Sequence, residues 1–147
     1  MKNILIIGGT GFIGSNILEA LTCDDYNIFL ITRRKDLEQL KNSRVKVIQG
    51  NLDETNLIKN IILEHGIEII LHLASNLIPS SVKSQFDEEM RDIVLPTFEL
   101  LNYISERNLK IIYFSSGGTI YGKADGKIIE NSKLEPINYH GYSKLIT

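Results

Sequence analysis

Short runs of apolar residues recur along the chain and predict strands. A continuous apolar run is typical of a strand covered on both faces, and an alternating run is typical of a half-buried strand. These runs are Asn3–Ile7, Asn27–Thr32, Arg44–Gln49, Ile67–Leu73 and Lys110–Ser115. The segments between them predict helices, mostly from apolar residues three or four positions apart. The predicted helices are Phe12–Leu21, the short and charged Lys35–Asn42, Glu54–His65, Ser84–Asn108 and a last one that starts near Gly141.

Two segments depart from this alternation. Pro96 lies inside the long helical segment and should kink or loosen it. Gly117–Asn138 is rich in glycine and is expected to be a loop. Strand–helix alternation with right-handed crossovers predicts an α/β fold, a doubly wound parallel sheet of strand order 3-2-1-4-5, with a ligand across the carboxyl ends of strands one and four.

Composition narrows the class of protein. The 147 residues suffice for one domain, and a net charge of −2 gives no reason to expect nucleic acid or an anionic membrane as partner. No stretch approaches the ~20 apolar residues of a membrane span, and no signal peptide is visible. The single cysteine, Cys23, suits a reducing cytoplasm and is expected to be a small core residue.

The most informative motif is a glycine turn after the first strand. Gly8 allows the tight turn, Gly11 lets a pyrophosphate approach the backbone, and Gly14 lets the helix pack closely. The helix that follows points free N–H groups, at Phe12 and Ile13, and its positive end toward the phosphates. An ordinary flexible turn is the alternative, but the position between strand and helix favours dinucleotide binding.

The end of the second strand indicates which dinucleotide binds. An acidic residue there would bond the ribose hydroxyls of NAD, whereas an arginine accommodates the 2′-phosphate of NADP. This chain has Thr32 followed by Arg33 and Arg34, with no carboxylate at that position. NADP is therefore favoured over NAD, and the alternative is a solvated charged loop.

Five motifs together resemble a known family. They are Gly8–Gly14, Asn51–Asp53, His72–Ser75, Ser115–Gly122 and His140–Lys144. In this order and spacing they resemble the N-terminal part of an extended short-chain dehydrogenase/reductase, of the NAD-dependent epimerase/dehydratase group acting on nucleotide sugars. The resemblance implies a Rossmann-type NAD(P)-binding domain over residues 1–147, incomplete at its C-terminal end and truncated before the family's C-terminal substrate lobe.

The resemblance also assigns roles near the cofactor. Asn51 and Leu52 would line the adenine, with Asp53 as N-cap of the next helix in the alternative interpretation. The backbone of Leu73, Ala74 and Ser75 would run along the ribose and the nicotinamide side. His72 is more simply a core histidine, and the three histidines lack the spacing of a metal site.

Two family positions are altered. The family's hydroxyl, four residues before Tyr121, falls on Gly117, so Ser116 or Thr119 would have to supply it. The family's Tyr-x-x-x-Lys pair retains Lys144, but His140 stands in place of the tyrosine. Residues four apart share a helix face, so His140 could do acid/base work beside Lys144. Alternatively, Tyr139 reaches in, or the site is inactive.

Two functions remain open. The first is an enzyme that transfers hydride between NADP or NAD and a sugar carbon of a nucleotide-sugar substrate, in an epimerase, dehydratase or reductase reaction. The second is an inactive dinucleotide-binding relative or fragment. A sheet edge left uncovered after the fifth strand predicts that the chain either associates with itself, as a homo-oligomer, or is poorly soluble.

Overall fold

Five parallel strands form one sheet in the order β3-β2-β1-β4-β5, which is the predicted order. The strands are β1 (Lys2–Ile7), β2 (Tyr26–Thr32), β3 (Val45–Gln49), β4 (Ile69–His72) and β5 (Lys110–Tyr113). The central strand is β1, in which Ile6 pairs with Leu30 of β2 and with Leu71 of β4. At the edge, Ile112 of β5 is 49% exposed, and self-association there stays a prediction.

The computed structural model describes residues 1–23, 25–35, 37, 44–124 and 126–147. The chain divides into two compact units. Unit 1 comprises Met1–Ala74 and Glu99–Phe114, and unit 2 comprises Ser75–Phe98 and Ser115–Thr147. The helix predicted at Lys35–Asn42 lies largely outside the described residues.

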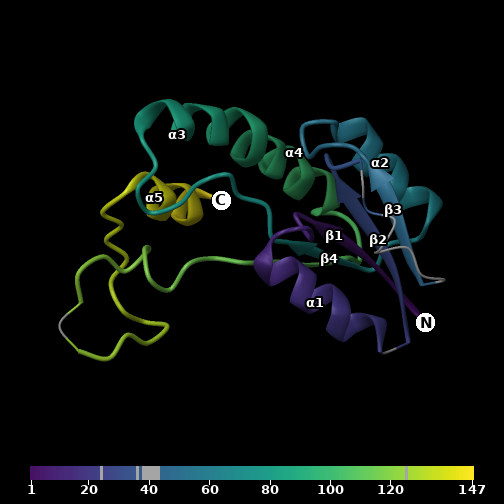
Figure 1. Cartoon of the computed structure of the whole chain (residues 1–147), viewed down its shortest axis with the longest axis horizontal. Helices are drawn as coiled ribbons and strands as arrows, with labels where there is room; N and C mark the ends of the chain where they lie inside the picture. The colour runs from purple at the N-terminus through teal and green to yellow at the C-terminus, as the bar shows by residue number, and fades with distance from the viewer. Residues whose placement is uncertain (24, 36, 38–43, 125) are drawn as a thin grey trace. The chain divides into compact units, whose positions relative to one another are not determined.

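Unit 1 contains the sheet and the helices that cover it. Helix α1 (Phe12–Thr22) lies on one face, and α2 (Thr55–Glu64) lies on the other with the C-terminal half of α4 (Leu95–Ile104) (Figure 1). On the α1 face, Leu18 belongs to a core cluster with Ile4, Ile6 and Leu30. Each such buried side chain contributes about 1.5–3 kcal/mol. Because Leu5 and Ile6 point to opposite faces and are both fully buried, β1 needs a continuous apolar run.

Unit 2 contains one long helical run and a short C-terminal helix. The run consists of α3 (Lys83–Glu89), a π-helical segment η2 (Met90–Val94) and the start of α4. The loosening predicted at Pro96 is confirmed, but the wide turn ends at Val94, before the proline. The reason is that a proline ring lacks an N–H and clashes with the carbonyl four residues earlier, that of Asp92.

Other predictions are confirmed or corrected in detail. Within the described residues, 115–138 contains no helix or strand, as expected of a loop. Helix α5 (Tyr139–Ile146) starts before Gly141, because the Asn138 side chain caps it by accepting from the Gly141 N–H. Cys23 is exposed, so its expected core role is wrong: it follows the last turn of α1 and does not face the sheet.

None of the helices in the described part of the chain combines the length and apolar character that a membrane crossing requires.

Candidate functional site

The glycine turn joins β1 to α1 and touches the end of β4. Gly8 has a φ of +82°, a left-handed conformation, and a Cβ placed on it would lie 2.6 Å from the Ala74 nitrogen. Gly8 therefore allows both the turn and the close approach of two chain segments. The Leu73 N–H donates to the Ile7 carbonyl at 2.8 Å, which holds Leu73 and Ala74 beside the turn.

The other glycines of the turn differ in what surrounds them. A Cβ on Gly14 would lie 2.5 Å from Gly9 Cα, so α1 packs on its own turn. A Cβ on Gly9, which sequence reasoning did not single out, would lie 2.6 Å from Leu30 Cδ1. A Cβ on Gly11, in contrast, would meet only the Gly8 carbonyl oxygen at 3.9 Å. Packing in the described chain thus requires Gly8, Gly9 and Gly14 but leaves Gly11 open.

The start of α1 is suited to an anion. Gly11 is the N-cap and makes no side-chain cap, and the first turn carries no acidic residue. The first N–H groups of a helix have no acceptor within it, so those of Phe12 and Ile13 point out of the helix end. Both side chains are exposed, Phe12 at 87% and Ile13 at 56%, although they are large and apolar. The free amides at this exposed helix start could therefore bind an anion such as a phosphate.

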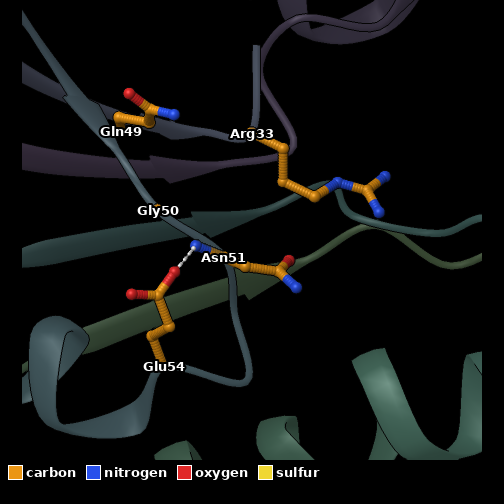
Figure 2. Close-up of a pocket in the computed structure, with 5 residues that line it drawn as sticks. All are labelled: Arg33, Gln49, Gly50, Asn51 and Glu54. Carbon is orange, nitrogen blue, oxygen red and sulfur yellow. Dashed lines mark hydrogen bonds between the residues drawn. The ribbon is translucent and has the colours of Figure 1, made fainter. Parts of the chain in front are cut away.

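A pocket of about 410 Å³ lies at the carboxyl ends of β2 and β3, lined by Arg33, Gln49, Gly50, Asn51 and Glu54 (Figure 2). The Glu54 carboxylate accepts from the Asn51 N–H at 2.8 Å, which fixes the turn after β3. The side chains of Arg33 and Asn51 extend in the same general direction in Figure 2. The lining of the pocket therefore includes one cationic side chain (Arg33), two amides (Gln49 and Asn51) and one anionic side chain (Glu54) that a polar ligand could contact.

Neighbours of this pocket have structural roles. Thr32 is buried, and its hydroxyl accepts from the Arg34 N–H at 3.1 Å, so it shapes the turn that carries Arg33. Leu52 is 3% exposed, so the protein itself covers the side chain that was expected to pack on the adenine. The N-cap of α2 is Glu54 and not Asp53, which corrects the alternative interpretation of that residue. Sequence reasoning missed Gln49 and Glu54, since a strand end and a helix start gave no chemical signal.

The segment after β4 passes from unit 1 to unit 2. His72 is fully buried, and its ring lies edge-on to that of Tyr113 with the ring centroids 5.3 Å apart. It is therefore a core histidine, as expected. Ser75 donates its hydroxyl to Glu89 at 2.7 Å, and the Asn76 N–H donates to the same carboxylate at 2.8 Å. Sequence reasoning missed Glu89, which is 1% exposed.

The predicted hydroxyl residues lie in unit 2. The Ser116 carbonyl accepts from the Thr119 N–H at 3.2 Å, which folds the segment into a turn. Thr119 is 6% exposed, and its hydroxyl has no hydrogen-bond partner within the described residues. At Gly117 a Cβ would meet nothing within 4 Å, so the structure has room there for the hydroxyl side chain of the family.

Helix α5 carries both His140 and Lys144, one turn apart on one face. Burial lowers the pKa of the His140 ring, Lys144 lowers it further, and Glu89 opposes both. Burial also lowers the pKa of the Lys144 ammonium, and the Glu89 carboxylate opposes that change. The ring nitrogen Nδ1 of His140 is buried without a hydrogen-bond partner in the described part of the chain.

Two further contacts define the start of α5. Tyr139 stacks on Phe86 with ring centroids 5.1 Å apart, so its ring is engaged by α3. A Cβ on Gly141 would lie 2.4 Å from the Thr119 carbonyl oxygen, so the Thr119 main chain packs on the residue after His140. Unit 2 therefore brings Thr119, His140 and Lys144 into one neighbourhood, with Tyr139 turned to a different contact.

Comparison with known proteins gives the same family as the motifs. The model of the NAD dependent epimerase/dehydratase family matches residues 4–147. The chain is 28% identical to a UDP-glucose 4-epimerase of Lactobacillus helveticus, over 97% of this chain and 44% of the relative. It is 30% identical to a dTDP-4-dehydro-6-deoxyglucose reductase of Escherichia coli, over 99% of this chain and 48% of the relative.

A solved structure, UDP-glucuronic acid 4-epimerase from Bacillus cereus in complex with NAD, superposes with a TM-score of 0.82. It is 27% identical, over 98% of this chain and 49% of that chain. The chain thus spans about half the length of the relatives that it matches. Since the family model matches nearly the whole chain, the protein belongs to the NAD dependent epimerase/dehydratase family.

Proposed function

We propose that this chain binds a nicotinamide dinucleotide and serves hydride transfer at a carbon of a nucleotide sugar. The observation that carries the proposal is the open position of Gly11 at the start of α1, between glycines that packing requires. Relatives named as UDP-glucose 4-epimerases and a structure solved with NAD support it. Isothermal titration calorimetry of the chain with NAD and NADP tests it, and no binding at millimolar dinucleotide would contradict it.

The residues fit the cofactor in separate stretches of the chain. Gly11, Phe12 and Ile13 would hold the diphosphate, Arg33 and Asn51 the adenosine end, and the Leu73–Ser75 backbone the nicotinamide side. When bound, the nicotinamide carries the hydride. His140 would accept or return the proton of a sugar hydroxyl, with Ser116 or Thr119 donating to the reacting oxygen.

We propose NADP as the preferred dinucleotide. Arg33 lines the pocket and can hold a 2′-phosphate through paired hydrogen bonds. The pocket also contains the Glu54 carboxylate, one oxygen of which accepts from the Asn51 N–H. The dinucleotide in the Bacillus cereus structure is NAD, so this preference needs its own test.

Arg33→Ala is expected to weaken NADP binding about tenfold or more, because hydrogen bonds to charged groups contribute about 1.5–3 kcal/mol each. NAD, which lacks the 2′-phosphate, should bind as before. Calorimetric titration of both dinucleotides measures the two affinities. Arg34→Ala is the matched control, since Arg34 does not line the pocket. Equal losses for NAD and NADP, or none for NADP, would show that Arg33 does not select the dinucleotide.

The lowered pKa of His140 favours the neutral ring near pH 7, which can accept a proton. His140→Gln is therefore expected to reduce turnover of a nucleotide sugar roughly 100-fold or more with unchanged dinucleotide affinity. In the native protein, turnover should fall as the pH is lowered through the pKa of His140, because the protonated ring cannot act as a base. A panel of UDP- and dTDP-sugars, assayed in the protein at its native length, provides the measurement.

Two observations favour the second candidate, an inactive relative: glycine occupies position 117 and histidine position 140. If turnover appears only after His140→Tyr, alone or with Gly117→Ser, the natural chain is an inactive dinucleotide-binding protein. Space for the second change exists, since a Cβ at Gly117 meets nothing within 4 Å.

A cytoplasmic location also stays a prediction, which the single cysteine favours.

A further inference from the structure

Glu89 is a buried carboxylate that the proposed chemistry does not use directly. It is 1% exposed and ends α3, directly before the π-helical segment η2. A charge removed from water is costly unless it is hydrogen-bonded and paired. A surface position on the same helix would have avoided that cost, as the exposed Glu88 does. The contacts of Glu89 therefore indicate what its burial achieves.

Three groups donate to this carboxylate from two distant stretches of the chain. Ser75 Oγ donates to Oε1 at 2.7 Å and the Asn76 N–H donates to Oε2 at 2.8 Å, both from the segment after β4. Ser143 Oγ, on α5, lies 3.4 Å from Oε1. Ser143 is 1% exposed and adjoins Lys144. Glu89 thus connects the segment proposed to follow the nicotinamide with the helix that carries His140 and Lys144.

We propose that Glu89 is a positioning residue, whose buried carboxylate fixes the Ser75–Asn76 segment against α5 and keeps Lys144 charged beside His140. This rests on the proposed function, in which the Leu73–Ser75 backbone follows the nicotinamide and His140 exchanges a proton with the sugar. Lys144 can bind ribose hydroxyls as an ammonium donor only while it is protonated. Burial lowers its pKa, and Glu89 is the group that opposes this loss.

Other charges around α5 are paired or exposed. They belong to α3 and η2, which pack on α5, and comprise the Lys83–Asp87 pair at 2.7 Å, Glu88, and the Arg91–Asp92 pair at 2.8 Å. On α5 itself the other titratable groups are Tyr139 and Tyr142, both exposed. Glu89 is therefore the buried negative charge, among the described residues of these elements, that acts on both His140 and Lys144.

The test compares Glu89→Gln with Glu88→Gln. Glutamine keeps the size of Glu89 but removes its charge, and it retains only one of the two acceptor oxygens. We expect the pKa of His140 and of Lys144 both to fall in Glu89→Gln, since an opposite charge favours the protonated form. Titration of the histidine ring and lysine side-chain NMR signals in the free protein measures this, with His140→Gln and Lys144→Arg to assign them. Glu88→Gln should leave both pKa values unchanged.

Cofactor binding is the second readout. In Glu89→Gln we expect NAD(P) affinity to fall about tenfold, the loss expected for one hydrogen bond to a charged group. The alkaline pH at which affinity declines should also move lower. Glu89→Asp retains the charge but cannot reach both partners, so it should keep the native pKa values and still lose affinity. It carries the test if Glu89→Gln does not fold.

The outcomes separate this proposal from the proposed function. Unchanged pKa values in Glu89→Gln, or native affinity in Glu89→Asp, would overturn the role of Glu89. If the native chain binds neither dinucleotide, the proposed function fails, whereas the NMR titration still decides whether Glu89 controls the charge of Lys144. No substitution that places a neutral residue at position 89 is expected to restore the native affinity for NAD(P).

Discussion

Gly8→Ala is expected to destabilise the protein by about 2–5 kcal/mol. A left-handed conformation costs a non-glycine residue roughly 1–2 kcal/mol, and Gly8 has a φ of +82°. The added Cβ would also lie 2.6 Å from the Ala74 nitrogen, and overpacking of this kind costs about 1–3 kcal/mol more. Chemical denaturation followed by circular dichroism measures the free energy of unfolding, which should drop with an unchanged denaturant slope.

Gly66→Ala is the matched control for the clash. Gly66 also has a positive φ, +54°, but a Cβ there would meet only Asn3 Nδ2 at 3.9 Å. Gly66→Ala should therefore lose only the roughly 1–2 kcal/mol of stability that a left-handed conformation costs a non-glycine residue. Equal destabilisation of the two variants would mean that the contact between the turn and the end of β4 carries no strain, contrary to the geometry described above.

Gly11→Ala is expected to have the opposite profile, with stability kept and dinucleotide binding weakened. Gly11 has a φ of −82°, which alanine adopts, and its Cβ would enter open space. The loss of a glycine N-cap and the gain from a less flexible unfolded chain are each within about 1 kcal/mol and oppose one another. The methyl group would instead occupy the space of a bound diphosphate, weakening NAD(P) binding roughly tenfold to a hundredfold by overpacking.

Calorimetric titration and thermal denaturation of the same sample separate these two effects. Gly14→Ala is the counterpart, because its Cβ would lie 2.5 Å from Gly9 Cα and should reduce stability first. If Gly11→Ala binds NAD and NADP as tightly as the native chain, the turn does not approach the diphosphate. If it unfolds instead, the described packing around Gly11 is wrong.

The fold was predictable because each strand has a recognisable pattern in its own stretch of sequence. A parallel strand covered on both faces needs a continuous apolar run, and Leu5 and Ile6 show why: both are fully buried on opposite sides of β1. The connections between runs then leave few topologies. The exposure of Cys23 was not predictable in this way, because a shift of one residue at a helix end decides whether a side chain faces the core.

The residues of the candidate site were predictable only where they belong to a short sequence motif. The glycine turn and the His140–Lys144 spacing are short patterns, so both could be located by position. Glu89 has no such pattern: it ends an acidic run, Asp87-Glu88-Glu89, that indicates a solvated helix face. Its role depends on Ser143, which is 54 positions away in sequence. Contacts of that separation are set by the fold and leave no local trace.

The glycines illustrate how structure sharpens a motif. The sequence predicted a tight turn at Gly8 and close helix packing at Gly14, and the structure shows that a Cβ at either position would meet main-chain atoms. It also adds Gly9, whose Cβ would collide with Leu30 and Ile6. Only the position left without a packing reason needs a ligand to explain it, and that position is Gly11.

Amide NMR of the isotopically labelled native chain, titrated with NADP and, separately, with NAD, identifies the N–H groups that meet the dinucleotide. We expect the N–H signals of Gly11, Phe12, Ile13 and Gly14 to shift more than those of any other segment and to saturate with the dinucleotide. Signals of these four amides that stay in place while others shift would show that the dinucleotide binds elsewhere, and would contradict the assignment of the β1–α1 turn as its diphosphate site.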